Sequence, residues 1–557
     1  MTIDNMKKTT FEKADFNQWK ELAVNSLRGK PYEALTTKTL EGIDLQPLYY
    51  ERKAFDGASV VRSSKRNAGW IIAQQTIASD GADYIEQLEE SIEKGNEAIV
   101  YDGEHPFNWT DDQLQKLSSF IAKFPVFYFN VRKDDAILRA FDFVHHEVRE
   151  SVTGIIQVAD WTVPVGYNNI RTAGADLWKA HHDGADAVTE LAIALSEASR
   201  IASSSESFQA FADNFFVRLP IDTHFFMEIA KLRAFRVLWQ AFAQAYGVNE
   251  PPFIPVFAVT SLRSFSKLDP NVNMLRAGNE TFAAILGGAD VIQAHPHNIL
   301  TGPNASSIRN SRNMQLVLKE EAHVEKVLDP AGGSYFIEQL TEELVEKSWK
   351  LFLEIESKGG INPFLASGRL EENFLKLQNE IATGKRSLIG TNVYAELTST
   401  NFDEWGGINQ IARLSEPFEK LRQSFSENQP KTVLLTFGKL KDFKPRADFV
   451  TSFLASGGIK SSWSPAFENV EQAVEWLDTE KPDYAIVCGK DEIVSAEMES
   501  LLEKLPADIM LDVAGKIDQN TMHKWKQLGL NGMIFNRQNK IEKLQSVLTS
   551  WQGGTRE

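Results

Sequence analysis

Between residues 66 and 400, short apolar runs alternate with longer segments of helical periodicity. The runs that read as strands lie at 69–75, 97–103, 125–131, 154–160, 215–221, 253–259 and 289–296. Helical patterns such as 186–202 and 224–247 separate them. This alternation predicts a parallel sheet covered by helices. At this length it favours an eight-stranded β/α (TIM-type) barrel over an open sheet, with any active site at the C-terminal edge of the strands.

A second, shorter alternation fills residues 431–557. Its strand-like runs lie at 432–438, 459–464, 484–489, 509–515 and 532–536. Five strands with crossover helices predict a doubly wound parallel sheet of the flavodoxin-like kind. The chain therefore divides into a helical arm with an extended segment (1–60), the barrel (61–400), a polar linker (401–430) and this last domain (431–557).

The net charge of −17 argues against a nucleic-acid or anionic-membrane surface. Cys488 is the single cysteine among 557 residues, so a disulfide within the chain is impossible, which fits a reducing compartment. The first residues lack a signal-peptide pattern, and no run of about 20 apolar residues predicts a membrane helix. We expect a soluble, cytoplasmic protein.

Two histidine motifs could carry chemistry. His181 and His182 precede Asp183, but adjacent residues diverge on helices and strands, so we interpret them as part of a polar loop that caps a helix beginning near Asp186. His295 and His297 end a candidate strand with the spacing of a metal pair. Pro296 between them spoils simple alternation, so we predict no metal site.

Other polar features have a plain structural interpretation. Asp329, Pro330 and the glycine pair at 332–333 read as a turn. Three basic residues on one helical segment could meet phosphate or carboxylate groups, but we interpret them as solvated; they are Lys231, Arg233 and Arg236. Walker A, zinc CxxC, HExxH and G-x-S-x-G patterns do not occur. Composition and spacing alone therefore do not name a reaction.

Longer segments carry a family resemblance. LEGIDLQPLYY (40–50) is like an N-terminal signature, and HFFMEIAKLRAFRVLW (224–239) is close to "NFFMEIAKxRAGRxLW". Residues 273–293 match "NVxRTxxEAxAAxxGG", and residues 309–341 match "RIARNTQxIIQEES…DPxGGSYxxExLT". The chain resembles the cobalamin-dependent acyl-CoA mutases over nearly its whole length, and most closely the small (β) subunits of methylmalonyl-CoA mutases. The resemblance implies a barrel that binds acyl-CoA along its axis, joined to a flavodoxin-like cobalamin domain.

The catalytic pattern of that family is altered in this sequence. "RPWTIRQY" aligns with residues 68–75, where the two arginines become Ala68 and Ala73 and the tyrosine becomes Gln75. The family histidine that contacts the thioester carbonyl falls at Lys179 without gaps, whereas a two-residue gap would bring His181 to that place. The resemblance thus implies that no catalytic residues remain on this chain.

The cobalamin pattern is altered as well. The family motif D-x-H-x-x-G falls on Leu440, Asp442 and Pro445, so the imidazole that ligates cobalt and the carboxylate that orients it are both missing. The family's Ser-x-Leu begins at Gly489, and its Gly-Gly ends at Gly515. We expect no cofactor-binding residues and no metal site here.

These departures imply the small, non-catalytic subunit of a heterodimer. Its partner would be a large (alpha) subunit that carries adenosylcobalamin and acyl-CoA, and neither nucleic acid nor membrane would be involved. One alternative is an active mutase of another acyl-CoA that uses a separate cobalamin protein. A second is a non-enzymatic chaperone or binding partner of the mutase.

Overall fold

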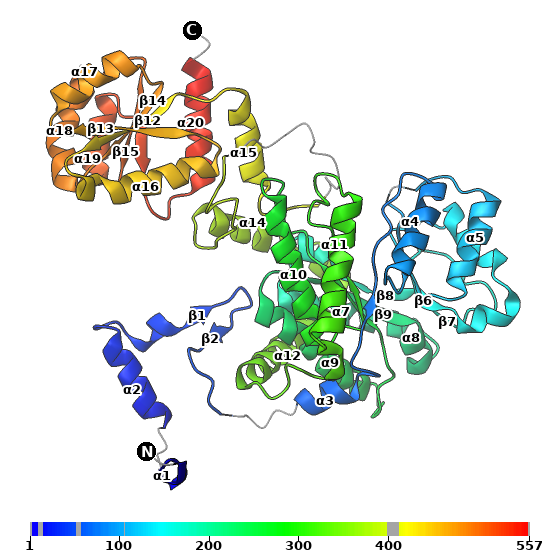
Figure 1. Ribbon diagram of the computed structural model, residues 1–557. Coiled ribbons are helices and arrows are strands. Elements are labelled where there is room, and N and C mark those ends of the chain that lie inside the picture. The colour runs from blue at the N-terminus through cyan, green and yellow to red at the C-terminus, as the bar shows by residue number, and fades with distance from the viewer. Residues whose placement is uncertain (1–2, 9–14, 52–56, 105, 398–410, 555–557) are drawn as a thin grey trace.

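The structure is a computed structural model that describes residues 3–8, 15–51, 57–104, 106–397 and 411–554. Figure 1 shows a large central region of strands and helices, a separate α/β unit near the C-terminus, and an N-terminal arm that projects away from both. Among the described residues, no helix combines the length and the apolar character needed to cross a membrane.

Two parallel sheets form the central region. One has the order β3-β11-β10-β9-β8 and the other the order β4-β5-β6-β7. The strands of the first are β3 (Ile71–Ile72), β11 (Val291–Gln293), β10 (Val256–Thr260), β9 (Phe215–Ile221) and β8 (Ala173–Asp176). Those of the second are β4 (Ile99–Asp102), β5 (Val126–Phe129), β6 (Thr153–Ile156) and β7 (Asn169–Arg171). A parallel bridge between Gln75 and Val100 links the sheets on one side. On the other side, only Thr172 separates β7 from β8.

These strands are buried on both faces, as their continuous apolar sequence requires. All four residues of β5 and all seven of β9 are buried. Successive side chains of β5 alternate between faces, so Phe127 and Phe129 point between the two sheets while Val126 and Tyr128 pack against the covering helices.

Long helices cover the first sheet. They are α7 (Ala187–Ser203), α9 (Phe225–Ala245), α10 (Pro270–Gly287), α11 (Ala305–Leu316) and α12 (Tyr335–Ser357). Asp186 caps α7 by accepting a hydrogen bond from the Thr189 backbone N–H at 2.8 Å, which confirms the helix start expected there. The apolar faces of α7, α9 and α12 pack together over the sheet in one cluster.

The C-terminal unit is a five-stranded parallel sheet in the order β13-β12-β14-β15-β16. Its strands are β12 (Thr432–Phe437), β13 (Ser461–Phe467), β14 (Tyr484–Cys488), β15 (Met510–Ala514) and β16 (Gly532–Ile534). Numbered within the unit, the order is 2-1-3-4-5, so it reverses between β12 and β14. The helices include α16 (Leu440–Ser456), α18 (Asp491–Lys504), α19 (Gln519–Gln527) and α20 (Lys540–Gly554).

Cations of the C-terminal part meet backbone carbonyls of the central region. Arg422, on helix α15 (Glu416–Glu427), donates to the carbonyls of Gly390 and Thr391 at 3.2 Å. Lys540 donates to the Asn392 carbonyl at 2.6 Å. Residues 401–410 of the expected linker lie outside the described residues, and its remaining part contains the packed helix α15, with Phe418 and Phe425 buried.

The N-terminal arm holds helix α2 (Phe16–Ser26) and the antiparallel pair β1 (Thr37–Lys38) and β2 (Asp44–Leu45). Asp15 and Gln18 form a capping box that begins α2. No residue of α2 is buried. Figure 1 shows this helix standing away from the central region.

Two local features were not expected from the sequence. The helix after β12 begins at Leu440, so the three positions aligned with D-x-H-x-x-G, Leu440, Asp442 and Pro445, all lie within it. Pro445 is the sixth residue of this helix, so its missing N–H leaves the Lys441 carbonyl without its intrahelical hydrogen bond. Strands β7 and β8 were not predicted, because most of residues 169–176 are of types that strands disfavour: Asn169, two alanines, Gly174 and Asp176 leave Ile170 as the one large apolar residue.

Candidate functional site

Aromatic side chains fill the space between the two central sheets. Phe127 and Phe129 of β5 meet Phe257 of β10 with ring centroids 5.2 and 5.1 Å apart. The guanidinium carbon of Arg218 lies 4.0 Å from the Phe129 centroid, and its Nη1 donates to the Asp176 carboxylate at 3.1 Å. We name this group the inner cluster; its buried apolar members are Ala73, Ala98, Val100, Phe127, Phe129, Ile155, Phe216, Phe257, Val259 and Val291.

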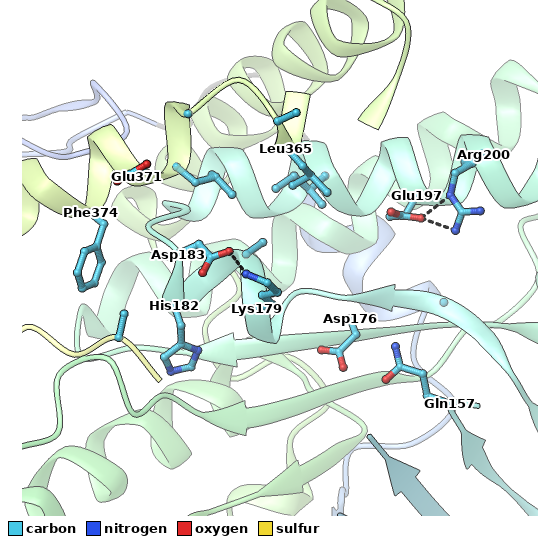
Figure 2. A pocket seen from close by; sticks show the side chains of 17 residues that line it. Gln157, Asp176, Lys179, His182, Asp183, Glu197, Arg200, Leu365, Glu371 and Phe374 are labelled. Carbon is cyan, nitrogen blue, oxygen red and sulfur yellow. Dashed lines mark hydrogen bonds and ion pairs between the residues drawn. The ribbon is translucent and has the colours of Figure 1, made fainter. Parts of the chain in front are cut away.

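A cavity of about 850 Å³ lies beside this region, and we name it the side cavity. Figure 2 shows its polar side chains coming from the chain ends after β6 and β8, from α6 (Trp178–His182) and from α7. Residues 365–374, which include the start of helix α14 (Arg369–Ala382), close it on the other side. It is within the size range of small-molecule pockets.

The charges in the side cavity are paired locally. The Lys179 amine and the Asp183 carboxylate lie 2.5 Å apart, and the Arg200 guanidinium lies 2.7 Å from the Glu197 carboxylate. Figure 2 shows both pairs. The Lys179 side chain is 84% exposed, so its charge is turned to solvent. It does not offer a positioned donor for a bound carbonyl group.

A Ser–His–Glu arrangement includes His181 of helix α6. His181 Nδ1 donates to the Glu190 carboxylate at 2.7 Å, and the Ser261 hydroxyl lies 2.7 Å from His181 Nε2. Burial lowers the pKa of His181, so the ring is neutral and can accept a proton from serine. However, Ser261 and His181 are fully buried. A nucleophile needs access to substrate, so this arrangement serves as a structural network.

Further carboxylates surround that network. Lys231 binds Glu190 at 2.7 Å and Glu228 at 2.6 Å, and Arg263 binds Asp222 at 2.7 Å. Burial raises the pKa of Glu228 to about 8, because the single lysine charge is shared with Glu190. The pKa of Asp222 is lowered by Arg263 against the opposing effect of burial. One glutamic acid of the Lys231 pair is therefore protonated at neutral pH.

The residues that follow β3 also lie at the C-terminal end of the central strands. Ala73 is fully buried in the inner cluster. Arg312 donates to the Gln74 amide oxygen at 2.7 Å, and Gln293 donates to the Gln75 amide oxygen at 3.0 Å. The two glutamines are therefore held by protein partners.

In the C-terminal unit, the turns after β12, β14 and β15 come together. Asp442, at the start of α16, and Lys490, which follows β14, form an ion pair at 2.7 Å. Arg446 donates to the Gly489 carbonyl and to the Asp491 carboxylate, each at 2.6 Å. A Cβ placed on Gly515 would lie 3.4 Å from the Arg446 guanidinium carbon. We name the space between these turns the switch crevice, because the strand order reverses there.

The comparisons with known proteins agree in naming one family. The family model described as methylmalonyl-CoA mutase matches residues 139–445, which is more than half of the chain. The chain belongs to the methylmalonyl-CoA mutase family. Within this family it is similar to proteins named as small subunits, which confirms the resemblance drawn from residues 40–50, 224–239, 273–293 and 309–341.

Three relatives show how far the likeness extends. The "Probable methylmalonyl-CoA mutase small subunit" of Mycobacterium tuberculosis is 33% identical over 61% of this chain and 58% of its own length. The "Methylmalonyl-CoA mutase small subunit" of Porphyromonas gingivalis is 25% identical over 95% of this chain and 96% of its own. The "Methylmalonyl-CoA mutase, mitochondrial" of Macaca fascicularis is 25% identical over 73% and 64%. The chain thus spans 58% of the length of the mycobacterial relatives it matches.

The positions assigned from the family pattern form two groups in this mutase-family chain. Ala73, Gln75 and Lys179 lie at the C-terminal end of the central strands, and Ala68 precedes β3 as a half-buried residue. The second group lies around the switch crevice: Leu440, Asp442, Pro445, Gly489 and Gly515. Leu440 is 60% exposed. The roles assigned to these positions stay predictions. Among the described residues, no cluster of His, Cys, Asp and Glu could hold a metal ion.

Some interpretations of polar residues were wrong. His181 and His182 are buried on helix α6 and are not part of a polar loop. The three basic residues of α9 are buried instead of solvated: Lys231 binds Glu190 and Glu228, Arg233 binds Asp329 and Glu338, and Arg236 binds Asp290. The turn at 329–333 is confirmed, with the Gly332 N–H donating to the Asp329 carbonyl.

Sequence reasoning also missed two residues of the site. Asp176 and Arg218 are far apart in the sequence and lie on strands, where no motif marks them. The signal available was Arg218 itself, a charged residue inside an otherwise apolar strand. Such a residue needs a partner when it is buried.

Proposed function

We propose that this chain is a small, non-catalytic subunit of a heterodimeric, adenosylcobalamin-dependent methylmalonyl-CoA mutase. Its large partner would bind the cofactor and interconvert methylmalonyl-CoA and succinyl-CoA. The bacterial relatives, which are named as small subunits of methylmalonyl-CoA mutase, support this proposal. The first 60 residues, the region 61–400, the linker 401–430 and the unit 431–557 would be its parts.

The inner cluster is the observation that carries the proposal. We infer that the two central sheets close into one eight-stranded barrel in which β7 and β8 count as a single strand; the Gln75–Val100 bridge supports this closure. An acyl-CoA bound along the barrel axis would need a channel there. Phe129 and Phe257 are at most 2% exposed, and their rings occupy that axis together with Arg218. Close-packed rings leave no passage for a pantetheine chain.

The residues around the switch crevice do not fit cobalamin. The strand order 2-1-3-4-5 supports a flavodoxin-like domain, whose ligands bind where the order reverses. Arg446 and the Asp442–Lys490 pair already bridge the turns at that place. Asp442 stands at the position of the family's cobalt-ligating histidine and supplies no imidazole. Helix α16 also begins where an open turn would be needed. We therefore assign the cofactor to the large subunit.

The N-terminal arm is the surface that we assign to the partner. Helix α2 has 11 residues and none of them is buried, and Leu22 is 72% exposed. An isolated helix of this length is only marginally stable in water, so a surface outside this chain would have to cover its apolar side. We infer that the arm packs against the large subunit.

The test is to purify the chain alone and together with a large mutase subunit that retains the cobalamin motif. We expect a stoichiometric complex that is active with adenosylcobalamin, and no mutase activity from the chain alone. Activity of the lone chain with a separate cobalamin protein would favour the first alternative. A partner that is active and stable without this chain, with no lasting complex, would favour the chaperone alternative.

A variant separates complex formation from folding. Leu22→Asp changes an exposed side chain on α2, so the chain should fold normally and bind the large subunit more weakly. Leu375→Asp is the matched control, because Leu375 is 55% exposed on α14. Equal binding by both variants would remove the arm from the proposed interface.

A further inference from the structure

A smaller cavity of about 360 Å³ lies between α10 and α11, beside the chain that follows β11. Met274 and Ala277 line it from α10, and Met314 and Val317 line it from α11 and the turn that follows. His295, from the QAHPHN motif, forms part of its wall and is only 4% exposed. We name it the His295 cavity; it has no part in the proposed function.

The hydrogen bonds of His295 fix its tautomer. Its Nδ1 lies 2.9 Å from the Thr260 carbonyl oxygen, which can only accept, so Nδ1 carries the proton and donates. Burial lowers the pKa of His295 to about 4, so the ring is neutral and Nε2 is an acceptor. The described residues give Nε2 no hydrogen-bond partner. Nε2 keeps access to the cavity, so it is free to accept a hydrogen bond from a molecule that enters there.

The rest of the wall defines the chemistry of that donor. The other polar lining residues are uncharged: His297, Ser307, Asn310, Ser311 and Asn313. No Lys, Arg, Asp or Glu among the described residues lines the cavity, so an ion would be desolvated without compensation. The sulfur atoms of Met274 and Met314 favour contact with an aromatic ring.

We propose that the His295 cavity binds a small, uncharged aromatic molecule that carries one N–H or O–H group. The donor group bonds to His295 Nε2, and the ring lies between Met274 and Met314. Because the imidazole is neutral and its Nδ1 proton is held by Thr260, the site binds such a ligand by hydrogen bonding and packing without a proton transfer. The occupied cavity would brace α10 and α11 against the ends of β10 and β11.

The experiment uses the full chain and a matched pair of probes, indole and indene, which share their shape and differ in the N–H group. Binding is measured by titration calorimetry and by the ¹⁵N chemical shift of His295 Nε2. One hydrogen bond to a neutral acceptor should make indole bind about 3- to 10-fold more tightly than indene. The Nε2 resonance should shift with indole and stay in place with indene.

Two variants locate the binding. His295→Leu should bind both probes equally, because the acceptor is lost while apolar packing remains. Val317→Trp should block the cavity from its rim, where Val317 is 46% exposed and a larger side chain can be placed without displacing the core. Val327→Trp, at a site 51% exposed and outside the cavity, is its matched control. Equal affinity of the two probes for the wild-type chain, no saturable binding of either, or unchanged binding by Val317→Trp would each overturn the proposal.

Discussion

Glu228 provides the sharpest test of the buried charge network. Its carboxyl group is 4% exposed and lies 2.6 Å from the Lys231 amine, which Glu190 also binds. Burial raises its pKa from 4.5 to about 8. Between these two values the folded chain keeps a proton that the unfolded chain releases, so stability falls as pH rises through this window. Above about pH 8 the loss is complete.

The magnitude follows from the shift. Each pKa unit corresponds to about 1.4 kcal/mol, and pH 7 lies about 2.5 units above the ordinary pKa of a glutamic acid. The folded chain must protonate Glu228, which is ionised in the unfolded chain, and this lowers the free energy of unfolding by about 3 kcal/mol at pH 7. Glutamine resembles the protonated acid and can still accept a hydrogen bond from Lys231. We therefore expect Glu228→Gln to match the wild-type chain near pH 5 and to exceed its stability near pH 7.5.

The assay is the midpoint of urea unfolding, followed by tryptophan fluorescence, at about pH 5 and pH 7.5. Infrared spectroscopy adds a direct measurement, because the carbonyl stretch of a protonated carboxyl group should weaken in Glu228→Gln. Glu354→Gln on the exposed face of α12 is the control and should leave the pH dependence unchanged. If Glu228→Gln keeps the wild-type pH dependence, or is less stable at pH 7.5, the assignment of a protonated Glu228 is wrong.

Three further predictions concern the interior and the switch crevice. Phe257→Ala should lower the stability of the chain by about 3–5 kcal/mol in a thermal unfolding experiment, because it leaves a cavity in the inner cluster, and it should not create mutase activity. Ser261→Ala should cost about 1–3 kcal/mol by leaving His181 Nε2 unpaired, while assays with activated esters show no activity before or after the change. Arg446→Ala should lower the melting temperature modestly, and an absorbance titration should show no cobalamin binding, since no cobalt ligand is restored.

Strand positions were predictable from the sequence because buried parallel strands are continuous apolar runs. β9 coincides with its predicted range, and β12 differs from its range by one residue. The strands β7 and β8 were not predictable, because their small and polar residues lack that signal, and their place is fixed by pairing with β6 and β9. Closure of the central sheets into a barrel stays a prediction.

The burial of α9 was not predictable for a different reason. Helix α9 is mostly apolar, but three cations within six residues, Lys231, Arg233 and Arg236, suggested an exposed face. Its cations are neutralised by partners such as Asp329, which lies 96 residues away from Arg233. Local sequence patterns cannot reveal pairs between residues so far apart. The likeness to a mutase family was readable because it depends on long matching segments, whereas the roles proposed for Lys179 and Pro445 depend on single aligned positions and stay predictions.

The packed interior between the central sheets affects how the stability of the folded chain depends on ligands. An enzyme whose core is completed by a substrate becomes less stable when that metabolite runs short. Here Phe127, Phe129 and Phe257 supply that filling from the chain itself. The amount of folded protein should therefore not depend on a ligand bound between the two sheets.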